Sequence, residues 1–333
     1  MTARDRQIAA FLAGAGWADA DRRALAGDAS ARRYDRLTDG RGHAAVLMIA
    51  PPEDAAGITT FQRLADHLAA AGLSAPRILA ADADTGLMLL EDLGDDTFTR
   101  LIARAPAREP DLYAAATDLL AELRAMDRPE GLVTLDPVTL AGMTDLAFTR
   151  YAAPITGADA TPRILPRLED LFHDALRGPA VFLHRDYHAD NLLWLPDRTG
   201  PARVGLLDFQ DAVAGPEAYD LVSLLQDARR DVPAAVEIAM TARFRDTLGQ
   251  DDHTFRTAYA VLGLQRNLRI LGVFARLACD FGKPRYLDLM PRVFGHVERN
   301  LDHPALAPVA QAILDALPRP TPATLSRLLP RTA

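Results

Sequence analysis

The sequence predicts an α+β protein with a small N-terminal lobe, which combines a β-sheet with a helix, and a larger, mainly helical C-terminal lobe. The first third of the chain carries short apolar runs separated by turn residues, whereas most of the remainder has apolar residues at helical spacing. The chain has 333 residues, which is enough to bury a large core and to form two lobes. We place the lobe boundary between residues 1–92 and 93–333.

Three strands and two helices are predicted in the N-terminal lobe. The strands are short apolar runs bounded by turn residues, at 44–50, 77–80 and 87–90. Residues 8–12 predict a short helix. Residues 59–71 predict a longer one, because Phe61 and Leu64 begin an apolar face at helical spacing. Gly72 follows as a helix stop signal.

The C-terminal lobe is predicted to be built mainly from helices. Their apolar faces are clearest at residues 111–126, 218–228, 234–248 and 257–279. The last of these helices is predicted to be interrupted at Gly263 or Gly272, because glycine disfavours a helix interior. From Leu317 onward the chain contains several prolines, which predicts a loosely attached tail. The sequence contains no internal repeat.

An ordered series of polar residues lies within the C-terminal lobe: His184, Asp186, Asn191 and Asp208. The apolar runs around these residues predict strands, at 181–183, 191–195 and 204–207. Residues 197–201 have turn composition and predict a hairpin between the last two strands. Such a hairpin returns Asp208 to the side of Asn191, while the preceding loop presents Asp186.

This combination of groups suits phosphoryl transfer from ATP. A carboxylate such as Asp186 accepts the proton of the attacking hydroxyl, while an amide and a second carboxylate hold magnesium on the phosphates. Amide and carboxylate oxygens are hard ligands, which favour Mg²⁺. A zinc site at His184 and His188 is a weaker alternative, because the segment has no helical pattern and no cysteine lies nearby. Each residue alone has a structural explanation, but the ordered set favours catalysis.

Composition is that of an ordinary globular protein, with 49% hydrophobic and 25% charged residues. The net charge of −8 argues against a nucleic-acid partner, because binding a phosphate backbone requires clustered positive charge. The single cysteine, Cys279, excludes an internal disulfide and fits a reducing cytoplasm. Residues 1–20 do not resemble a signal peptide, and no stretch has the length of a membrane span. We expect a cytoplasmic enzyme.

The motifs resemble those of a known family. His184-Arg-Asp186 with Asn191 resembles the catalytic loop of the protein-kinase-like superfamily, and Asp208-Phe-Gln resembles its metal-binding segment. His188 matches the pattern of the aminoglycoside phosphotransferase branch. Within that branch, four further segments are similar to the bacterial anomeric kinases that act on N-acetylmuramic acid and N-acetylglucosamine in cell-wall recycling. They are residues 27–34, 90–94, 208–216 and 219–225, and the whole resemblance runs from about residue 27 to about residue 292.

The resemblance implies a bilobal protein-kinase-like fold, with ATP and Mg²⁺ as cofactors. It implies that Asp186 is the catalytic base, that His184 braces the loop, and that Asn191 and Asp208 hold the metal. The nucleotide-binding residues that it implies are Ser30, Arg32, Arg33, Glu91 and Leu93, with the backbone of residues 91–94 contacting adenine. His188 and Asp220 are expected to support the loop.

Two departures from the kinase pattern affect the nucleotide site. Residues 27–33 replace a glycine-rich loop, with the Ser30 hydroxyl and two arginines in place of several glycines. Met48 occupies the strand position where the family has a lysine, and Gln62 lies where its glutamate partner is expected. The two halves of an ion pair are therefore absent together. We expect Arg32 or Arg33 to neutralise the phosphates instead.

The acceptor is expected to be a small sugar bound near the catalytic loop and the C-terminal helices. The candidate acceptor-binding residues are Gln210, Asp211, Arg266 and Arg276. A lactyl carboxylate on N-acetylmuramate favours a nearby cation, whereas a polycationic aminoglycoside favours an acidic pocket. Two alternatives remain open: a phosphotransferase for an aminoglycoside, choline-like or other hydroxyl compound, and a regulatory pseudokinase. No membrane or obligate protein partner is evident.

Overall fold

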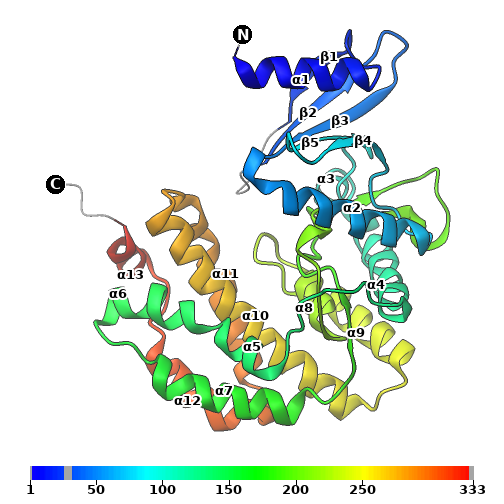
Figure 1. The fold of residues 1–333 in the computed structure, drawn as a ribbon. Helices are drawn as coiled ribbons and strands as arrows, with labels where there is room; N and C mark the ends of the chain where they lie inside the picture. Colours follow the sequence, from blue (N-terminus) through cyan, green and yellow to red (C-terminus); the bar gives the residue numbers. More distant parts are fainter. Residues whose placement is uncertain (1, 26–31, 330–333) are drawn as a thin grey trace. The chain divides into compact units, whose positions relative to one another are not determined.

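The computed structural model describes residues 2–25 and 32–329 (Figure 1). The chain divides into two compact units. The first unit contains the described residues up to Ala116 together with Ala189–Asp211, and the second contains Thr117–His188 and Ala212 to the end of the described chain. This division differs from the predicted boundary after residue 92. The segment that follows the N-terminal sheet packs with the later hairpin, where the Trp194 N–H donates to the Asp96 carbonyl.

The first unit contains a five-stranded antiparallel sheet with the order β1-β2-β3-β5-β4. Its strands are β1 (Asp21–Ala24), β2 (Arg33–Thr38), β3 (Ala44–Ile49), β4 (Ile78–Asp82) and β5 (Leu87–Glu91). The three predicted strands are confirmed as β3, β4 and β5. Strands β1 and β2 were not predicted from the sequence, because they are rich in charged residues and lack a clear apolar run.

Helix α1 (Ala3–Gly14) packs on this sheet, and helix α2 (Ala55–Ala70) lies beside it (Figure 1). Helix α1 extends well beyond the predicted residues 8–12 and begins with a capping box between Thr2 and Asp5. Its Ile8 and Leu12 are buried in a cluster with sheet residues such as Leu47. Helix α2 confirms the second predicted helix. The first unit also includes α3 (Phe98–Arg104), the start of α4 (Glu109–Ala125), and the hairpin of β7 (Leu192–Trp194) and β8 (Val204–Leu206).

The second unit is mainly helical. Its helices are α5 (Pro137–Gly142), α6 (Ala153–Thr156), α7 (Thr161–Ala175), α8 (Tyr219–Leu225), α9 (Ala234–Leu248), α10 (Asp252–Asp280), α11 (Met290–Leu301), α12 (Ala307–Ala316) and α13 (Pro322–Leu325), with a π-helical segment at Ala147–Ala152. One antiparallel pair, β6 (Ala180–Leu183) and β9 (Val213–Pro216), flanks in sequence the segment that contains the predicted catalytic residues. Within the described residues, no helix is long and apolar enough to cross a membrane.

Helix α10 is continuous over 29 residues, so the predicted interruption at Gly263 or Gly272 is wrong. Both glycines instead permit close packing. A Cβ atom at Gly272 would lie 2.5 Å from the backbone nitrogen of Ala147, and one at Gly263 would lie 2.5 Å from the Asn300 side-chain oxygen. The long helix therefore keeps its hydrogen bonds and uses glycine for contact with its neighbours.

The predicted loose tail is also wrong for the described residues up to 329. Leu317, Leu325 and Leu328 are buried, and the Tyr151 hydroxyl donates a hydrogen bond to the Pro318 carbonyl. The prolines of this segment begin short helices rather than preventing structure, as Pro322 does at the start of α13. The segment therefore contributes to the core of the second unit.

Candidate active site

The β7–β8 hairpin places Asn191 and Asp208 side by side in the first unit. Leu192 pairs with Leu206, and the Leu207 N–H donates a 2.9 Å hydrogen bond to the Asn191 carbonyl. Asn191 immediately precedes β7, and Asp208 follows β8 by two positions. The predicted hairpin is therefore confirmed, and its backbone ladder explains how residues 17 positions apart come together.

Asp208 has a left-handed backbone conformation, with φ of 61°. A non-glycine residue pays a steric cost for this conformation, and such residues gather at functional sites. Its Oδ1 atom accepts a 3.2 Å hydrogen bond from the Gln210 side-chain amide. The Asp208 carboxylate and Asn191 amide supply hard oxygen donors, which suit a magnesium ion whose other ligands are phosphate oxygens and water. Residues Phe209–Asp211 form a short 3₁₀ turn, and Asp211 at its end is exposed.

Tyr34 on β2 is a neighbour of Asp208 that the sequence did not single out. Burial raises the pKa of Tyr34 to about 12, and the nearby Asp208 charge acts in the same direction. Tyr34 pairs across the sheet with Met48, which is fully buried in the strand position expected for lysine. A tyrosine close to Asp208, the predicted metal ligand, leaves no recognisable spacing signal in the sequence.

The two predicted phosphate-binding arginines differ in their surroundings. The Arg32 guanidinium forms an ion pair with Asp54, with 2.9 Å between Nη2 and Oδ2, and is largely buried. Arg33 is 59% exposed and its Nη2 atom lies 3.6 Å from Asp35. Ser30, the third predicted member of this group, lies outside the described residues. Arg32 also lies close enough to Tyr34 to oppose the rise in its pKa, so it belongs to the same neighbourhood as Asp208.

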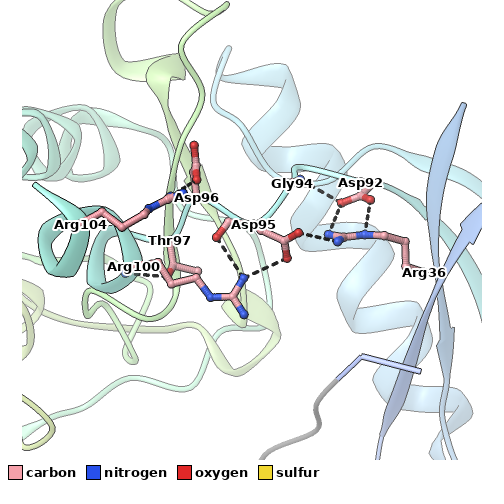
Figure 2. A network of polar contacts seen from close by, with 8 residues as sticks. All are labelled: Arg36, Asp92, Gly94, Asp95, Asp96, Thr97, Arg100 and Arg104. Carbon is pink, nitrogen blue, oxygen red and sulfur yellow. Dashed lines mark hydrogen bonds and ion pairs between the residues drawn. The ribbon is translucent and has the colours of Figure 1, made fainter. Parts of the chain in front are cut away.

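Arg36 holds the segment that leaves β5, as Figure 2 shows. Its Nε atom lies 2.6 Å from Asp92 and its Nη1 atom lies 2.6 Å from Asp95. The Asp92 carboxylate also accepts a 2.9 Å hydrogen bond from the Gly94 N–H, and Asp95 binds Arg100. One guanidinium therefore fixes both sides of the turn at Gly94, which has φ of 86°.

The remaining side chains of this segment are also occupied. Glu91 accepts hydrogen bonds from Arg77 at 3.2 Å and from Arg198 at 2.8 Å. The Leu93 side chain lies against Gly205 of β8, where an added Cβ atom would meet it at 3.2 Å. The Glu91 carboxylate is thus used in ion pairs, and the N–H groups of Glu91 and Gly94 donate to the Arg77 carbonyl and to Asp92, so the backbone around Leu93 is the part of this segment left to meet a ligand.

In the second unit, the loop that carries the predicted catalytic residues begins where β6 ends. The Asp220 carboxylate, at the start of α8, accepts hydrogen bonds from the backbone N–H groups of His184 at 2.6 Å and Arg185 at 2.9 Å. Arg185 has φ of 77°, and it and Asp208 are the only non-glycine residues with positive φ among those described. The Arg185 carbonyl accepts a 3.0 Å hydrogen bond from Arg266, so the strained residue is held on both sides.

Asp186 follows this anchored residue, and its side chain is 42% exposed. Burial acts to raise its pKa, but the positive charges of Arg266 and its neighbours outweigh burial and hold the pKa below the usual range. The Arg266 Nη2 atom lies 3.7 Å from Asp186 Oδ1. Asp186 is therefore an ionised, partly accessible carboxylate next to a residue that Asp220 and Arg266 anchor by hydrogen bonds.

The two histidines of the motif are buried. His184 packs edge-on against Tyr187, with 5.6 Å between ring centroids. Burial and the nearby Arg229 charge hold the pKa of His188 well below its usual range, so its ring is neutral. No group of three His, Cys, Asp or Glu residues is arranged as a metal site within the described part of the chain.

Three arginines of α10 lie along one side of the helix: Arg266, Arg269 and Arg276. Arg266 is buried over the ring of Tyr219, 5.5 Å from its centroid, and its guanidinium is used by the catalytic loop. Arg276 is half-buried. Arg269, which the sequence analysis did not select, is also half-buried and is influenced by the Asp186 and Arg266 charges. Its spacing of three residues from Arg266 was the available signal.

Comparisons with known proteins show which family this chain belongs to and which proteins it is similar to. Residues 21–262 match the model of the phosphotransferase enzyme family. An N-acetylmuramate/N-acetylglucosamine kinase of Caulobacter vibrioides is 39% identical, over 91% of this chain and 94% of the relative. A kinase of the same name from Pseudomonas aeruginosa is 33% identical, over 88% of this chain and 87% of the relative.

Solved structures share the fold at low sequence identity. A choline/ethanolamine kinase family protein from Mesorhizobium loti has a TM-score of 0.62 at 17% identity, covering 93% of this chain and 99% of that one. A thermostable aminoglycoside phosphotransferase mutant, in a ternary complex with ADP and hygromycin B, has a TM-score of 0.63 at 14% identity, covering 91% of this chain and 100% of that one. The predicted α+β, kinase-like fold class is thereby confirmed.

Proposed function

Because this chain belongs to the phosphotransferase enzyme family and is an ATP-dependent small-molecule kinase, we propose that it phosphorylates the anomeric hydroxyl of N-acetylmuramate and N-acetylglucosamine. The observation that carries the proposal is the ionised, accessible Asp186 on a loop that Asp220 and Arg266 hold in place. The identity of 39% to a kinase named for these two sugars, over nearly the whole chain, supports the acceptor. The proposed setting is peptidoglycan recycling in the cytoplasm.

Asp186 is assigned as the general base. It accepts the proton of the acceptor hydroxyl as that oxygen attacks the terminal phosphate of ATP. An anomeric hydroxyl is more acidic than an ordinary alcohol, so a base whose pKa lies below the usual carboxyl range is adequate. His184 and His188 are assigned supporting roles, since both are buried and His188 is neutral.

Asn191 and Asp208 are assigned as the magnesium ligands. Their positions beside one another at the end of the β7–β8 hairpin support this role. Magnesium bound there would supply positive charge to the phosphate groups of ATP. The left-handed conformation of Asp208 and the hydrogen bond from Gln210 orient its carboxylate. Gln210 is therefore assigned to the metal ligand rather than to the acceptor, and Asp211 remains a proposed acceptor contact.

Nucleotide binding is assigned to the backbone of residues 91–94 and to the β2 region. Arg32 is the preferred replacement for the missing strand lysine, because it lies near Asp208 and forms an ion pair with Asp54 next to α2. This pair resembles the absent lysine–glutamate pair in its charges. Arg33, which is largely exposed, is the second candidate, and Ser30 remains a proposed phosphate contact.

An ATP-consumption assay tests the proposal. The purified chain is supplied with ATP, Mg²⁺ and one of three acceptors: N-acetylmuramate, N-acetylglucosamine or kanamycin. We expect turnover with both sugars and none with kanamycin. Phosphorus NMR of the product is expected to show an anomeric phosphate, and a 6-phosphate would overturn the regiochemistry. Turnover with kanamycin alone would favour an antibiotic phosphotransferase, and ATP binding without any turnover would favour a pseudokinase.

A further inference from the structure

Arg269 is a half-buried cation that has no hydrogen bond or ion pair with any described residue. Its environment is unfavourable for a positive charge. Burial lowers the pKa of Arg269, and together with the like charges of Arg185 and Arg266 it outweighs the opposing effects of Tyr219 and Asp186. A charge that is partly removed from water requires a compensating partner. The position of this guanidinium therefore calls for an anionic group that the chain itself does not provide.

Arg266, the neighbouring arginine on α10, does not share this need. Arg266 donates to the Arg185 carbonyl at 3.0 Å, lies 3.7 Å from Asp186 and stacks over Tyr219. The Asp186 charge acts on Arg269, but Arg266 already engages this carboxylate, with 3.7 Å between Nη2 and Oδ1. The buried Asp220 is not available to Arg269, because both of its oxygens accept backbone N–H groups of the loop.

A second arginine, Arg276, lies on the same side of α10 as Arg269. Arg276 lies seven residues after Arg269, which is two helical turns and about 10 Å further along the same stripe. Its Nε atom is buried without a hydrogen-bond partner among the described residues. Val273, between the two arginines, is also half-buried. The stripe thus combines two uncompensated guanidinium groups with an apolar spacer, beginning close to Asp186.

We infer that Arg269 binds the carboxylate of an acidic acceptor and is the residue that distinguishes N-acetylmuramate from N-acetylglucosamine. This assignment rests on the proposed function. The two sugars differ by one lactyl group, which ends in a carboxylate. A guanidinium matches a carboxylate through two parallel hydrogen bonds, and these are stronger than hydrogen bonds between neutral groups. The shared parts of both sugars place their anomeric hydroxyl at Asp186, and only the acidic sugar extends a charge to Arg269.

The test compares Arg269→Ala and Arg269→Lys with the wild-type enzyme on both sugars. We expect Arg269→Ala to lower kcat/KM for N-acetylmuramate by roughly 10- to 100-fold, because a hydrogen-bonded charge is lost. Activity on N-acetylglucosamine should stay within about threefold, which also shows that the variant is folded. Arg269→Lys should recover part of the loss, since it keeps the charge but not the paired geometry.

Arg256→Ala serves as the matched control. Arg256 lies on α10 as well, but it is exposed and forms an ion pair with Asp252. We expect it to leave both substrates unaffected. Equal losses on both sugars, or no loss on N-acetylmuramate, would overturn the role of Arg269. A raised KM for ATP with N-acetylglucosamine would assign Arg269 to phosphate instead. A wild-type enzyme that phosphorylates neither sugar would overturn the proposed function itself.

Discussion

Asp220 accepts a 2.6 Å hydrogen bond from the backbone N–H of His184, which precedes it by 36 residues. The second carboxylate oxygen accepts the N–H of Arg185, the residue whose φ is 77°. A single side chain therefore satisfies two backbone donors at the point where the loop that carries Asp186 leaves β6. The unfavourable left-handed conformation of Arg185 is stabilised by its surroundings. These are the two hydrogen bonds to Asp220 and the hydrogen bond from Arg266 to the Arg185 carbonyl.

Asp220→Asn is expected to reduce turnover at least tenfold without unfolding the protein. The amide retains one acceptor oxygen but presents an NH₂ group to the other backbone N–H, which loses a hydrogen bond and displaces the loop that carries Asp186. Steady-state kinetics and the melting temperature of the same sample separate the two effects. Asp302→Asn, at an exposed carboxylate, is the control and should match the wild type. Wild-type turnover in Asp220→Asn would contradict the anchoring role.

Asp220 also makes a distinct contribution to the pH dependence of stability. Burial raises its pKa to about 7 in the folded protein, whereas the unfolded chain has a pKa near 3.8. The folded state therefore binds the proton more tightly. The stabilising effect of Asp220 is complete below pH 4 and is lost as the pH rises to about 7.

Urea unfolding of the wild type and Asp220→Asn at pH 5 and pH 8 measures this effect. The difference in unfolding free energy between the two proteins isolates Asp220 from the other carboxyl groups. We expect the advantage of the wild type to fall by about 3 kcal/mol from pH 5 to pH 8. A difference that is constant, or that grows with pH, would show that Asp220 is ionised throughout.

Asp186→Asn is expected to lower kcat by about 100- to 10,000-fold, the range that a general base usually contributes. The change preserves the size of the side chain but removes its negative charge, and with it the ability to accept a proton and the ion pair with Arg266. Nucleotide affinity, measured by calorimetry without acceptor, should change by less than about twofold. Asp197→Asn removes an exposed carboxylate in the turn of the β7–β8 hairpin and should retain full turnover. Comparable turnover in Asp186→Asn and the wild type would refute the assignment.

Arg36→Ala is expected to raise the KM for ATP by about tenfold while leaving the KM for the sugar unchanged. Its guanidinium fixes Asp92 and Asp95 on either side of Gly94, as in Figure 2, so its loss frees the backbone proposed to contact adenine. Asp92 is only 9% exposed, and removing its cation leaves a buried charge without its ion pair.

Arg100→Ala is the matched control for Arg36→Ala. Arg100 also binds Asp95, but its side chain is 61% exposed, and exposed ion pairs contribute at most about 1 kcal/mol. We expect a KM for ATP close to that of the wild type. Similar effects of the two substitutions would mean that Arg36 contributes only a surface charge.

The sequence predicted those parts of the site that depend on local patterns. Asn191 and Asp208 were placed together correctly because a turn between two apolar runs is a short-range signal. The contacts that hold the site join distant residues and leave no such signal. Arg36 and Asp92 are 56 positions apart, and no periodicity connects them. Arg269 shares helical spacing with Arg266 and Arg276, but only its environment in the fold distinguishes it from other helical arginines.

The wrong predictions about the fold have the same cause, because sequence patterns report local properties and not tertiary contacts. Strands β1 and β2 carry many charged residues, so a search for apolar runs passes over them. In α10, glycine has a low helix propensity, which is a local property. The packing of Gly272 against Leu146 and Ala147 is a tertiary property and outweighs it.

Gly272→Ala tests this explanation directly. The added Cβ atom would lie 2.5 Å from the backbone nitrogen of Ala147 and closer still to Leu146, and backbone atoms cannot move aside as a flexible side chain does. We expect the free energy of unfolding to fall by about 3 kcal/mol, in spite of the better helix propensity of alanine. Gly295→Ala in α11 is the control, since no atom lies within 4 Å of its Cβ position, and it should raise stability by up to about 1 kcal/mol. Urea unfolding measures both, and stabilisation of the two variants alike would show that Gly272 has no packing role.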